Sequence, residues 1–394
     1  MKRISLLLML CLSAVTFGQT TINQDSINNP QNQLNAAQRI LSGNIRSGVT
    51  VGGYGEITYN NPTGKNAEMD VQRLVLLFGY KFDDRTQFIT EVELEHVNQV
   101  FVEQAFIQYS VSDNFSFRGG LMLVPMGIVN EYHEPTTFNG VERPSMDAAI
   151  IPTTWREIGF GVTGKFDDAS LRYQAYIFNG FKSVESDGNG AITNGLIGGS
   201  KGLRGGRQKG IQSTFNNANF AGKLDYYGLP GLRLGLSGYF GRTQSPEDVQ
   251  DISGADVSIS MFGFDARYAK KRFTARGQFV YASLSDTEAY NTATSGSLGS
   301  ALQGYYLEAA YNLIPQGKRQ QLFGFVRYED YDTQASVDGA LTRNDAYNRN
   351  EWTFGLSYKI APGAVVKADY QLKDNAAAGS STTKQLNFGI GVWF

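Results

Sequence analysis

The chain has 394 residues, among them 35 basic and 37 acidic side chains, which give a formal net charge of −2. This balance does not favour a nucleic-acid-binding protein, for which a basic face would be expected. Beyond residues 1–18, no apolar stretch approaches the roughly 20 residues that a transmembrane helix needs. The mean hydropathy of −0.28 still suits a membrane protein, because strands that alternate between lipid and water average to a polar value.

Residues 1–18 have the pattern of a signal peptide. Lys2 and Arg3 form a basic start, an apolar run follows at 4–15, and small residues precede Gln19. We predict cleavage between Gly18 and Gln19. The only cysteine, Cys11, follows Leu10 rather than a small residue, so a lipoprotein anchor is not expected and the mature chain would hold no disulfide.

Residues 19–48 are rich in Asn and Gln and are predicted to form a periplasmic N-terminal tail before the first strand. Within them, residues 31–41 could form a short helix with Leu34, Ala37, Ile40 and Leu41 on one side. We expect this tail to be flexible. The alternatives are a helix that helps to form a trimer and a plug.

Residues 49–394 contain about sixteen segments of alternating polarity, with lengths close to the 9–11 residues of tilted membrane strands. The predicted strands are 50–59, 70–82, 86–96, 100–111, 115–124, 155–166, 170–179, 217–227, 232–241, 257–269, 272–284, 302–313, 320–331, 351–360, 364–373 and 384–394.

The connections between these segments alternate in length, and this predicts an all-β transmembrane antiparallel β-barrel. Tight turns rich in Asp, Gly and Pro separate longer polar stretches, with a short link at 96–99 as the exception. An up-and-down barrel has short periplasmic turns and long extracellular loops. A soluble β-sandwich would not force that asymmetry.

Strand parity assigns side chains to the two faces of the wall. In the last segment, Leu386, Phe388, Ile390, Val392 and Phe394 share one face, which we expect to meet lipid. The inward residues carry nearly balanced charge, which predicts a polar pore with weak charge preference. The predicted pore-lining residues are Arg73, Glu91, Glu93, Glu95, Arg118, Arg172, Lys223, Arg233, Arg276, Arg327 and Lys367.

The third connection on the long-loop side, residues 125–154, is too long and too apolar for a solvated loop tip. We predict that it folds inward and narrows the channel, the alternative being a loop packed on the rim or against a neighbouring subunit. The residues expected to set the charge of this constriction are Glu131, His133, Glu134, Glu142, Arg143 and Asp147.

We assign no specific site to two further features of the sequence. The basic residues Lys201, Arg204, Arg207 and Lys209 lie in a glycine-rich loop that we expect to be solvated, although it could recruit anions. The two histidines, His96 and His133, show no known zinc-site spacing, so neither a metal nor a cofactor is assigned.

Residues 101–165 resemble the phosphate-selective porin O and P family of outer-membrane channels. The resemblance rests on Glu103-x-Ala105-Phe106-Ile107-x-Tyr109, on Gly119-Gly120 before Pro125-x-Gly127, on Arg143-Pro144, and on Trp155-Arg156-Glu157-x-Gly159-x-Gly161. It implies a trimer of sixteen-stranded barrels, each with a pore constricted by its third extracellular loop. The family's arginine ladder and lysine cluster do not transfer directly, because Glu91, Glu93 and Glu95 form an inward acidic file here.

These patterns predict a porin in the outer membrane of a Gram-negative bacterium, giving passive transport of small hydrophilic solutes or ions, with anions such as phosphate among the candidates. No enzyme activity and no nucleic acid are expected. The expected partners are a homotrimer, outer-membrane lipid and lipopolysaccharide, and the barrel assembly machinery through Phe394. The alternatives are an outer-membrane barrel enzyme that uses His96 or His133, and a structural or adhesive barrel with a blocked lumen.

Overall fold

The computed structural model describes residues 29–43 and 48–394, so the predicted signal peptide lies outside the described residues. Within this part of the chain, sixteen strands close into one antiparallel barrel. They are β1 (Gly48–Pro62), β2 (Glu68–Lys81), β3 (Thr86–Glu95), β4 (Gln99–Ser112), β5 (Phe115–Leu123), β6 (Arg156–Phe166), β7 (Leu171–Phe178), β10 (Asn219–Tyr226), β11 (Leu232–Arg242), β12 (Ser258–Lys270), β13 (Phe273–Ser285), β14 (Ala301–Asn312), β15 (Gln321–Ser336), β16 (Asn348–Ala361), β17 (Ala364–Asn375) and β18 (Thr383–Trp393).

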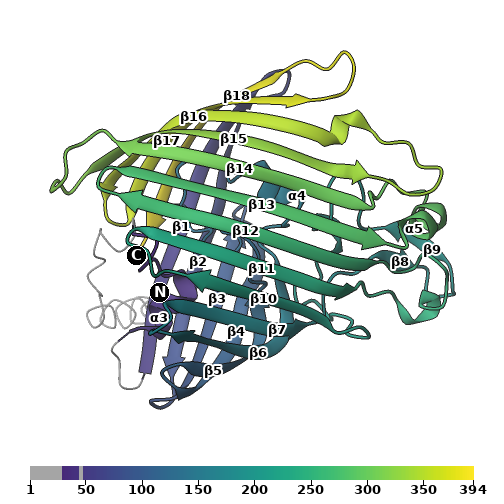
Figure 1. Ribbon diagram of the computed structural model, residues 1–394, viewed down its shortest axis with the longest axis horizontal. Helices are drawn as coiled ribbons and strands as arrows, with labels where there is room; N and C mark the ends of the chain where they lie inside the picture. Colours follow the sequence, from purple (N-terminus) through teal and green to yellow (C-terminus); the bar gives the residue numbers. More distant parts are fainter. Residues whose placement is uncertain (1–28, 44–47) are drawn as a thin grey trace, which may run out of the picture.

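Each strand pairs with its neighbours in the sequence, and β1 pairs with β18 to close the sheet (Figure 1). At this seam Tyr54 lies opposite Trp393, and the backbones of Gly53 and Phe394 exchange two hydrogen bonds of 2.9 Å. The predicted antiparallel barrel of sixteen strands is therefore confirmed. None of the described helices is long and apolar enough to cross a bilayer.

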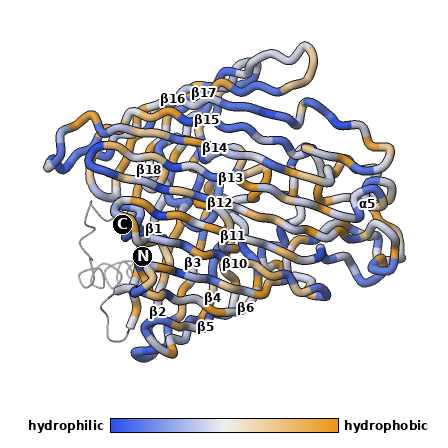
Figure 2. Tube along the Cα trace, viewed as in Figure 1, coloured by the Kyte–Doolittle hydropathy of each residue, from blue (hydrophilic) through white to orange (hydrophobic). Residues whose placement is uncertain are grey.

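Alternation along the strands separates an apolar outer face from an inner face that carries the charges. On β18, Phe388 and Ile390 are exposed on the outside, whereas Asn387 and Gly391 on either side of this pair are buried. Figure 2 shows apolar and polar positions interleaved along the strands, with the loops at the barrel ends mostly polar. The parity prediction for this strand is confirmed.

Short and long connections gather at opposite ends of the barrel. The long connections carry a hairpin of β8 (Val184–Ser186) and β9 (Ile192–Gly195), the helices α4 (Ser145–Ala149) and α5 (Thr287–Thr294), and the 3₁₀ turns η1 (Arg204–Gly206), η2 (Glu247–Val249) and η3 (Asp345–Tyr347). Figure 1 places α5, β8 and β9 at one end of the barrel. The short link at 96–98 forms a tight hairpin in which His96 and Val97 adopt positive φ angles of 52° and 68°.

The opposite end holds α3 (Ala36–Leu41), close to the C-terminal end of the chain (Figure 1). Ile40 packs against the inner wall at Gly79, where a Cβ atom would lie only 2.1 Å from its Cγ2 atom. Gln31 donates to the carbonyl oxygens of Tyr227 and Leu229 at 2.8 and 2.9 Å, in the turn after β10. Residues 29–43 therefore contact the barrel at its turn side, and the tail and plug roles stay predictions.

Candidate pore constriction

Residues 124–155 connect β5 to β6 and cross the barrel interior. Lys223 of β10 donates to the Gly127 carbonyl oxygen at 2.5 Å, and the Ile128 amide donates to Gln278 of β13 at 2.6 Å. Further along the loop, the Val141 amide donates to Asp369 of β17 at 2.5 Å. Since these three strands belong to distant sectors of the wall, the predicted inward folding of the third loop is confirmed.

Glycines on the inner face of the wall leave space for the loop. A Cβ atom on Gly391 of β18 would lie 2.7 Å from the Cβ atom of Pro135. The two inward glycines of this strand, Gly389 and Gly391, thus allow Val141 and Pro135 to contact the sheet directly. Close packing of this kind holds the loop in one position.

Four of the predicted constriction residues are buried where the loop packs inside the barrel, namely Glu131, His133, Glu134 and Asp147. The Glu131 carboxylate accepts from Lys223 at 2.9 Å and from Gln174 at 2.7 Å. Glu134 accepts from the Ala36 amide at 2.6 Å, so this side chain joins the loop to the first turn of α3. Burial raises the pKa of Glu134 above its usual value, against the opposing effect of His133.

Asp147 lies in α4 and is completely buried. One carboxylate oxygen accepts from Gln278 at 2.5 Å, and the other has no hydrogen-bond partner. Burial raises the pKa of Asp147 to about 7, although the hydrogen bond from Gln278 works in the opposite direction. A change of charge on this loop near neutral pH follows from that value.

His133 is buried against the wall with Tyr54 and Glu103. Its Nε2 atom lies 2.9 Å from the Tyr54 hydroxyl oxygen and 3.5 Å from a Glu103 oxygen. Burial alone would lower the pKa of His133, but the Glu103 carboxylate outweighs it and the pKa is raised. Arg73 donates a hydrogen bond to the His133 carbonyl oxygen, which fastens the loop backbone here as well.

Only Glu142 and Arg143 of the predicted set remain partly exposed. Glu142 accepts from Asn60 at 2.8 Å, and an Arg143 guanidinium nitrogen lies 3.7 Å from a Glu56 oxygen. Burial and the neighbouring Arg73 lower the pKa of Arg143. The other residues of the predicted set are buried, and the prediction that the set determines the charge of the constriction stays a prediction.

The predicted pore-lining residues lie on the inner face, and most of the cations among them are paired. The ion pairs are Arg73–Glu56 at 2.7 Å, Lys223–Glu131 at 2.9 Å, Arg233–Asp225 at 2.8 Å, Arg276–Glu308 at 3.0 Å and Arg327–Glu329 at 2.8 Å. Glu91, Glu93 and Lys367 are buried, while Glu95, Arg118 and Arg172 keep intermediate exposure.

Glu103 is one of the inward acids that the sequence prediction omitted. The register of β3 against β4 shifts there, since Glu91 lies opposite Gln104 but Val92 lies opposite Val102. The extra residue is a β-bulge, and it leaves both Glu103 and Gln104 buried inside the barrel. A bulge has no reliable sequence signal apart from the broken alternation around Val102 and Ala105.

The basic loop at 200–210 is not the solvated segment that the sequence predicted. Arg204 donates to the Thr153 carbonyl oxygen, and Arg207 donates to the Pro152, Thr153 and Thr154 carbonyl oxygens at 3.1–3.3 Å. The loop thus folds onto the end of the constriction loop. Burial, followed by repulsion from Arg204 and Arg156, lowers the pKa of Arg207 to about 9.

A cavity of about 80 Å³ lies next to the constriction loop. It is bounded by residues of the segment 29–43, the loop and strands β12 to β16. Three cations and one carboxylate are among its lining residues, namely Arg267, Arg276, Lys359 and Glu308.

A closed barrel of sixteen antiparallel strands with an inward third loop is the architecture of outer-membrane porins. No known protein-family model matches the chain. An uncharacterized protein of Aquifex aeolicus (strain VF5) is 35% identical over 350 residues, which cover 84% of this chain and 77% of that protein. The chain belongs to the same family as that protein.

Solved porin structures share the fold at low sequence identity. The anion-selective porin from Comamonas acidovorans aligns with a TM-score of 0.59 at 13% identity, over 88% of this chain and 100% of that chain. OmpF of Salmonella typhi in complex with daunomycin gives 0.59 at 14%, over 89% and 98%. The trimer form of in-vitro folded OmpT, an outer membrane protein of Vibrio cholerae, gives 0.55 at 12%, over 89% and 100%. The narrower resemblance to phosphate-selective porins stays a prediction.

Proposed function

We propose that the protein is an outer-membrane porin of a Gram-negative bacterium that gives passive diffusion to small hydrophilic solutes, with a preference for anions. The porin-type barrel, the apolar outer face and the inward loop support a channel. Diffusion needs a polar path and no nucleophile, so no enzyme activity is proposed. Phosphate would be one candidate among small anions.

The observation that carries the anion preference is an imbalance in pairing at the long-loop end. Arg204, Arg207 and Lys209 have no carboxylate within 4 Å among the described residues, and all three keep partial exposure. Burial and Arg207 lower the pKa of Lys209, while burial and Arg143 lower the pKa of Arg204. Cations that repel one another in this way favour an anion among them.

We further propose a homotrimer, as in the OmpT trimer form, embedded in outer-membrane lipid and lipopolysaccharide. Assembly would depend on the seam between β1 and β18, where Phe394 pairs with Gly53. Phe394 is proposed to be read by the barrel assembly machinery.

The test is the reversal potential of the purified protein in planar bilayers under a potassium chloride gradient. We expect chloride preference in the natural protein, and openings in groups of three would support the trimer. Replacing Arg204 and Arg207 together by Gln should reduce the chloride-to-potassium permeability ratio about five-fold. This corresponds to about 1 kcal/mol, the interaction of two charges 4 Å apart in water.

Lys201→Gln provides the matched control, since Lys201 lies in the same loop but is exposed. It should leave the permeability ratio nearly unchanged. A cation-selective natural protein, or a double variant with unaltered selectivity, would refute the anion preference. A correctly folded protein that never conducts would instead favour the structural barrel, which the packed loop and the segment 29–43 make the second candidate.

A further inference from the structure

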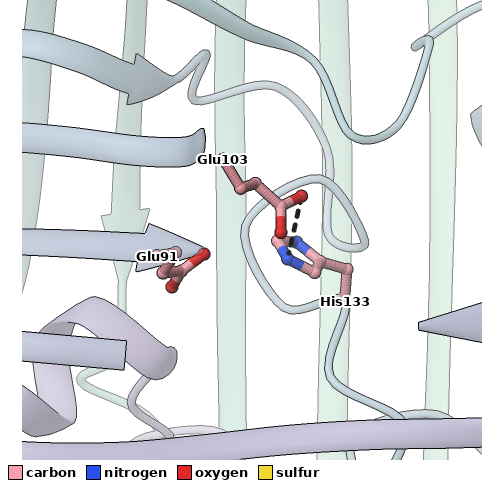
Figure 3. Close-up of side chains that lie close together, drawn as sticks. All are labelled: Glu91, Glu103 and His133. Carbon is pink, nitrogen blue, oxygen red and sulfur yellow. Dashed lines mark ion pairs between the residues drawn. The ribbon is translucent and has the colours of Figure 1, made fainter. Parts of the chain in front are cut away.

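Three side chains that can bind metal ions meet inside the barrel. Glu91 comes from β3, Glu103 from β4 and His133 from the constriction loop (Figure 3). One ligand atom from each lies within 4.8 Å of the others. The exposed fractions of these residues are 0%, 0% and 2%, so the cluster is shielded from bulk water.

The β-bulge on β4 creates this juxtaposition. Strict alternation counted back from the inward side chains of Phe106 and Gln104 would place Glu103 on the outer face, because side chains alternate along a strand. The bulge turns Glu103 inward beside Glu91 on the neighbouring strand. The constriction loop then brings His133 to the two carboxylates, held by the hydrogen bond from Arg73 to its carbonyl oxygen.

Hydrogen bonding orients the imidazole ring of His133 for coordination. Its Nδ1 atom lies 3.0 Å from the Asn130 carbonyl oxygen, which can only accept, so Nδ1 carries the proton. In the neutral ring, the Nε2 atom then keeps its lone pair for a metal ion, and this atom lies 3.5 Å from a Glu103 oxygen. A backbone carbonyl that fixes the far nitrogen of a histidine is the usual outer-shell arrangement around a bound metal ion.

The carboxylates provide the second, independent observation. Neither oxygen of Glu91 has a hydrogen-bond partner among the described residues. Glu103 accepts from the Tyr54 hydroxyl at 3.2 Å with one oxygen, and its other oxygen has no hydrogen bond but lies 3.5 Å from His133 Nε2. A buried carboxylate in this condition is costly unless a cation compensates it. Arg73 is already engaged by Glu56 at 2.7 Å, and His133 can supply at most one positive charge for two carboxylates.

We propose that Glu91, Glu103 and His133 bind one divalent first-row transition metal ion, such as Zn²⁺, Mn²⁺ or Fe²⁺. One imidazole nitrogen with two carboxylates suits this class, and the two negative charges match a divalent ion. In a tetrahedral site, bonds of about 2.0–2.2 Å place ligand atoms about 3.3–3.6 Å apart. His133 Nε2 and the Glu103 oxygen, 3.5 Å apart, already match this spacing, whereas a pair of ligand atoms at the 4.8 Å limit of the cluster would have to approach by about 1 Å. The ion takes the place of any proton on Nε2.

Such an ion would connect the constriction loop to β3 and β4. His133 is the loop's contribution, and the two carboxylates belong to the wall. A bound ion would therefore hold the loop against the wall, so the role of the metal would be to stabilise the position of the constriction loop. This inference does not depend on which solutes cross the barrel.

The experiment uses the purified full-length protein after removal of metal ions by a chelator. Co²⁺ is added and its visible absorption is recorded, and Zn²⁺ binding is measured by calorimetry. We expect one ion per chain. Glu91→Gln and His133→Asn should each abolish binding in the accessible concentration range, and Tyr54→Phe, which removes a neighbouring hydroxyl, should weaken it about ten-fold.

His96→Asn is the matched control, because the chain has only two histidines and His96 is an exposed residue paired with Asp70 at 2.5 Å. This variant should bind Co²⁺ like the natural protein. Glu91→Gln removes an uncompensated buried charge, so it should fold, and circular dichroism and electrophoretic mobility verify this. No Co²⁺ spectrum, or binding that survives His133→Asn, would overturn the proposal; Glu103→Gln gives a second check on the same outcome.

Discussion

Asp147 links the chemistry of one side chain to the position of the constriction loop. Its carboxylate is buried, has one partner in Gln278, and has a pKa raised to about 7 from an ordinary value of 3.8. The protonated carboxyl stabilises the folded state. This contribution is complete below pH 3.8 and is lost as the pH rises through about 7.

Asp147→Asn should therefore change how stability depends on pH. The amide keeps an oxygen that can accept from Gln278 and carries no charge at any pH. Relative to the natural protein, the variant should gain stability on the order of 3 kcal/mol at pH 8.5 and almost none at pH 4. Denaturant unfolding in detergent, followed by tryptophan fluorescence at both pH values, measures the difference.

Glu142→Gln serves as the control for that experiment, because Glu142 lies in the same loop but is partly exposed. Its effect should be small at both pH values. Parallel pH profiles for Asp147→Asn and the natural protein would show that Asp147 does not titrate in this range.

The segment 29–43 acts as one element at the turn-side mouth. Gln31 attaches it to the turn after β10, Ile40 packs on Gly79, and Ala36 donates to Glu134 of the constriction loop. It also borders the cavity lined by Arg267 and Arg276.

Deleting residues 29–43 should increase the single-channel conductance while the barrel still forms. The remaining constriction loop would keep its contacts to β10, β13 and β17. Gln31→Ala, which removes only the attachment to the turn, should give more frequent transitions between conductance levels than the natural protein. Equal conductance of the deletion variant and the natural protein would place the segment outside the path.

Sequence alternation predicted the elements of the wall well, because every strand has lipid on one side and polar groups on the other. The same rule failed at Glu103, where a bulge breaks the period. Alternation also could not predict which residues Arg204 and the segment around Ile40 contact. Their positions depend on contacts with residues distant in the chain, such as Thr153 and Gly79, which no local pattern records.

The site was predicted only in part for the same reason. The inward folding of residues 124–155 followed from length and apolar content. The partners of Glu131, Glu134 and Asp147 did not, because those acids are neutralised or buried by Lys223, Ala36 and Gln278 from separate elements. The net charge of a loop in the sequence therefore differs from the charge that a solute would meet.

At the scale of the whole molecule, the outer face forms a continuous apolar belt. On β11, Leu236 is 58% exposed, and on the neighbouring strand β12 Phe262 and Phe264 are 52% and 49% exposed. Such a surface would promote aggregation in water, whereas hydrocarbon around it removes that cost. The belt therefore predicts where the molecule tolerates charge.

Leu236→Arg tests this prediction, because Leu236 lies near the middle of β11 on the outer face. An arginine at the bilayer midplane should destabilise the protein folded in lipid vesicles, lowering its free energy of unfolding by about 2–4 kcal/mol. Leu232→Arg, at the end of the same strand, should cost about 0–1 kcal/mol, since its guanidinium can reach the interface. Equal losses for both variants would mean that the depth of the residue does not matter, as expected if water and not lipid surrounds the barrel.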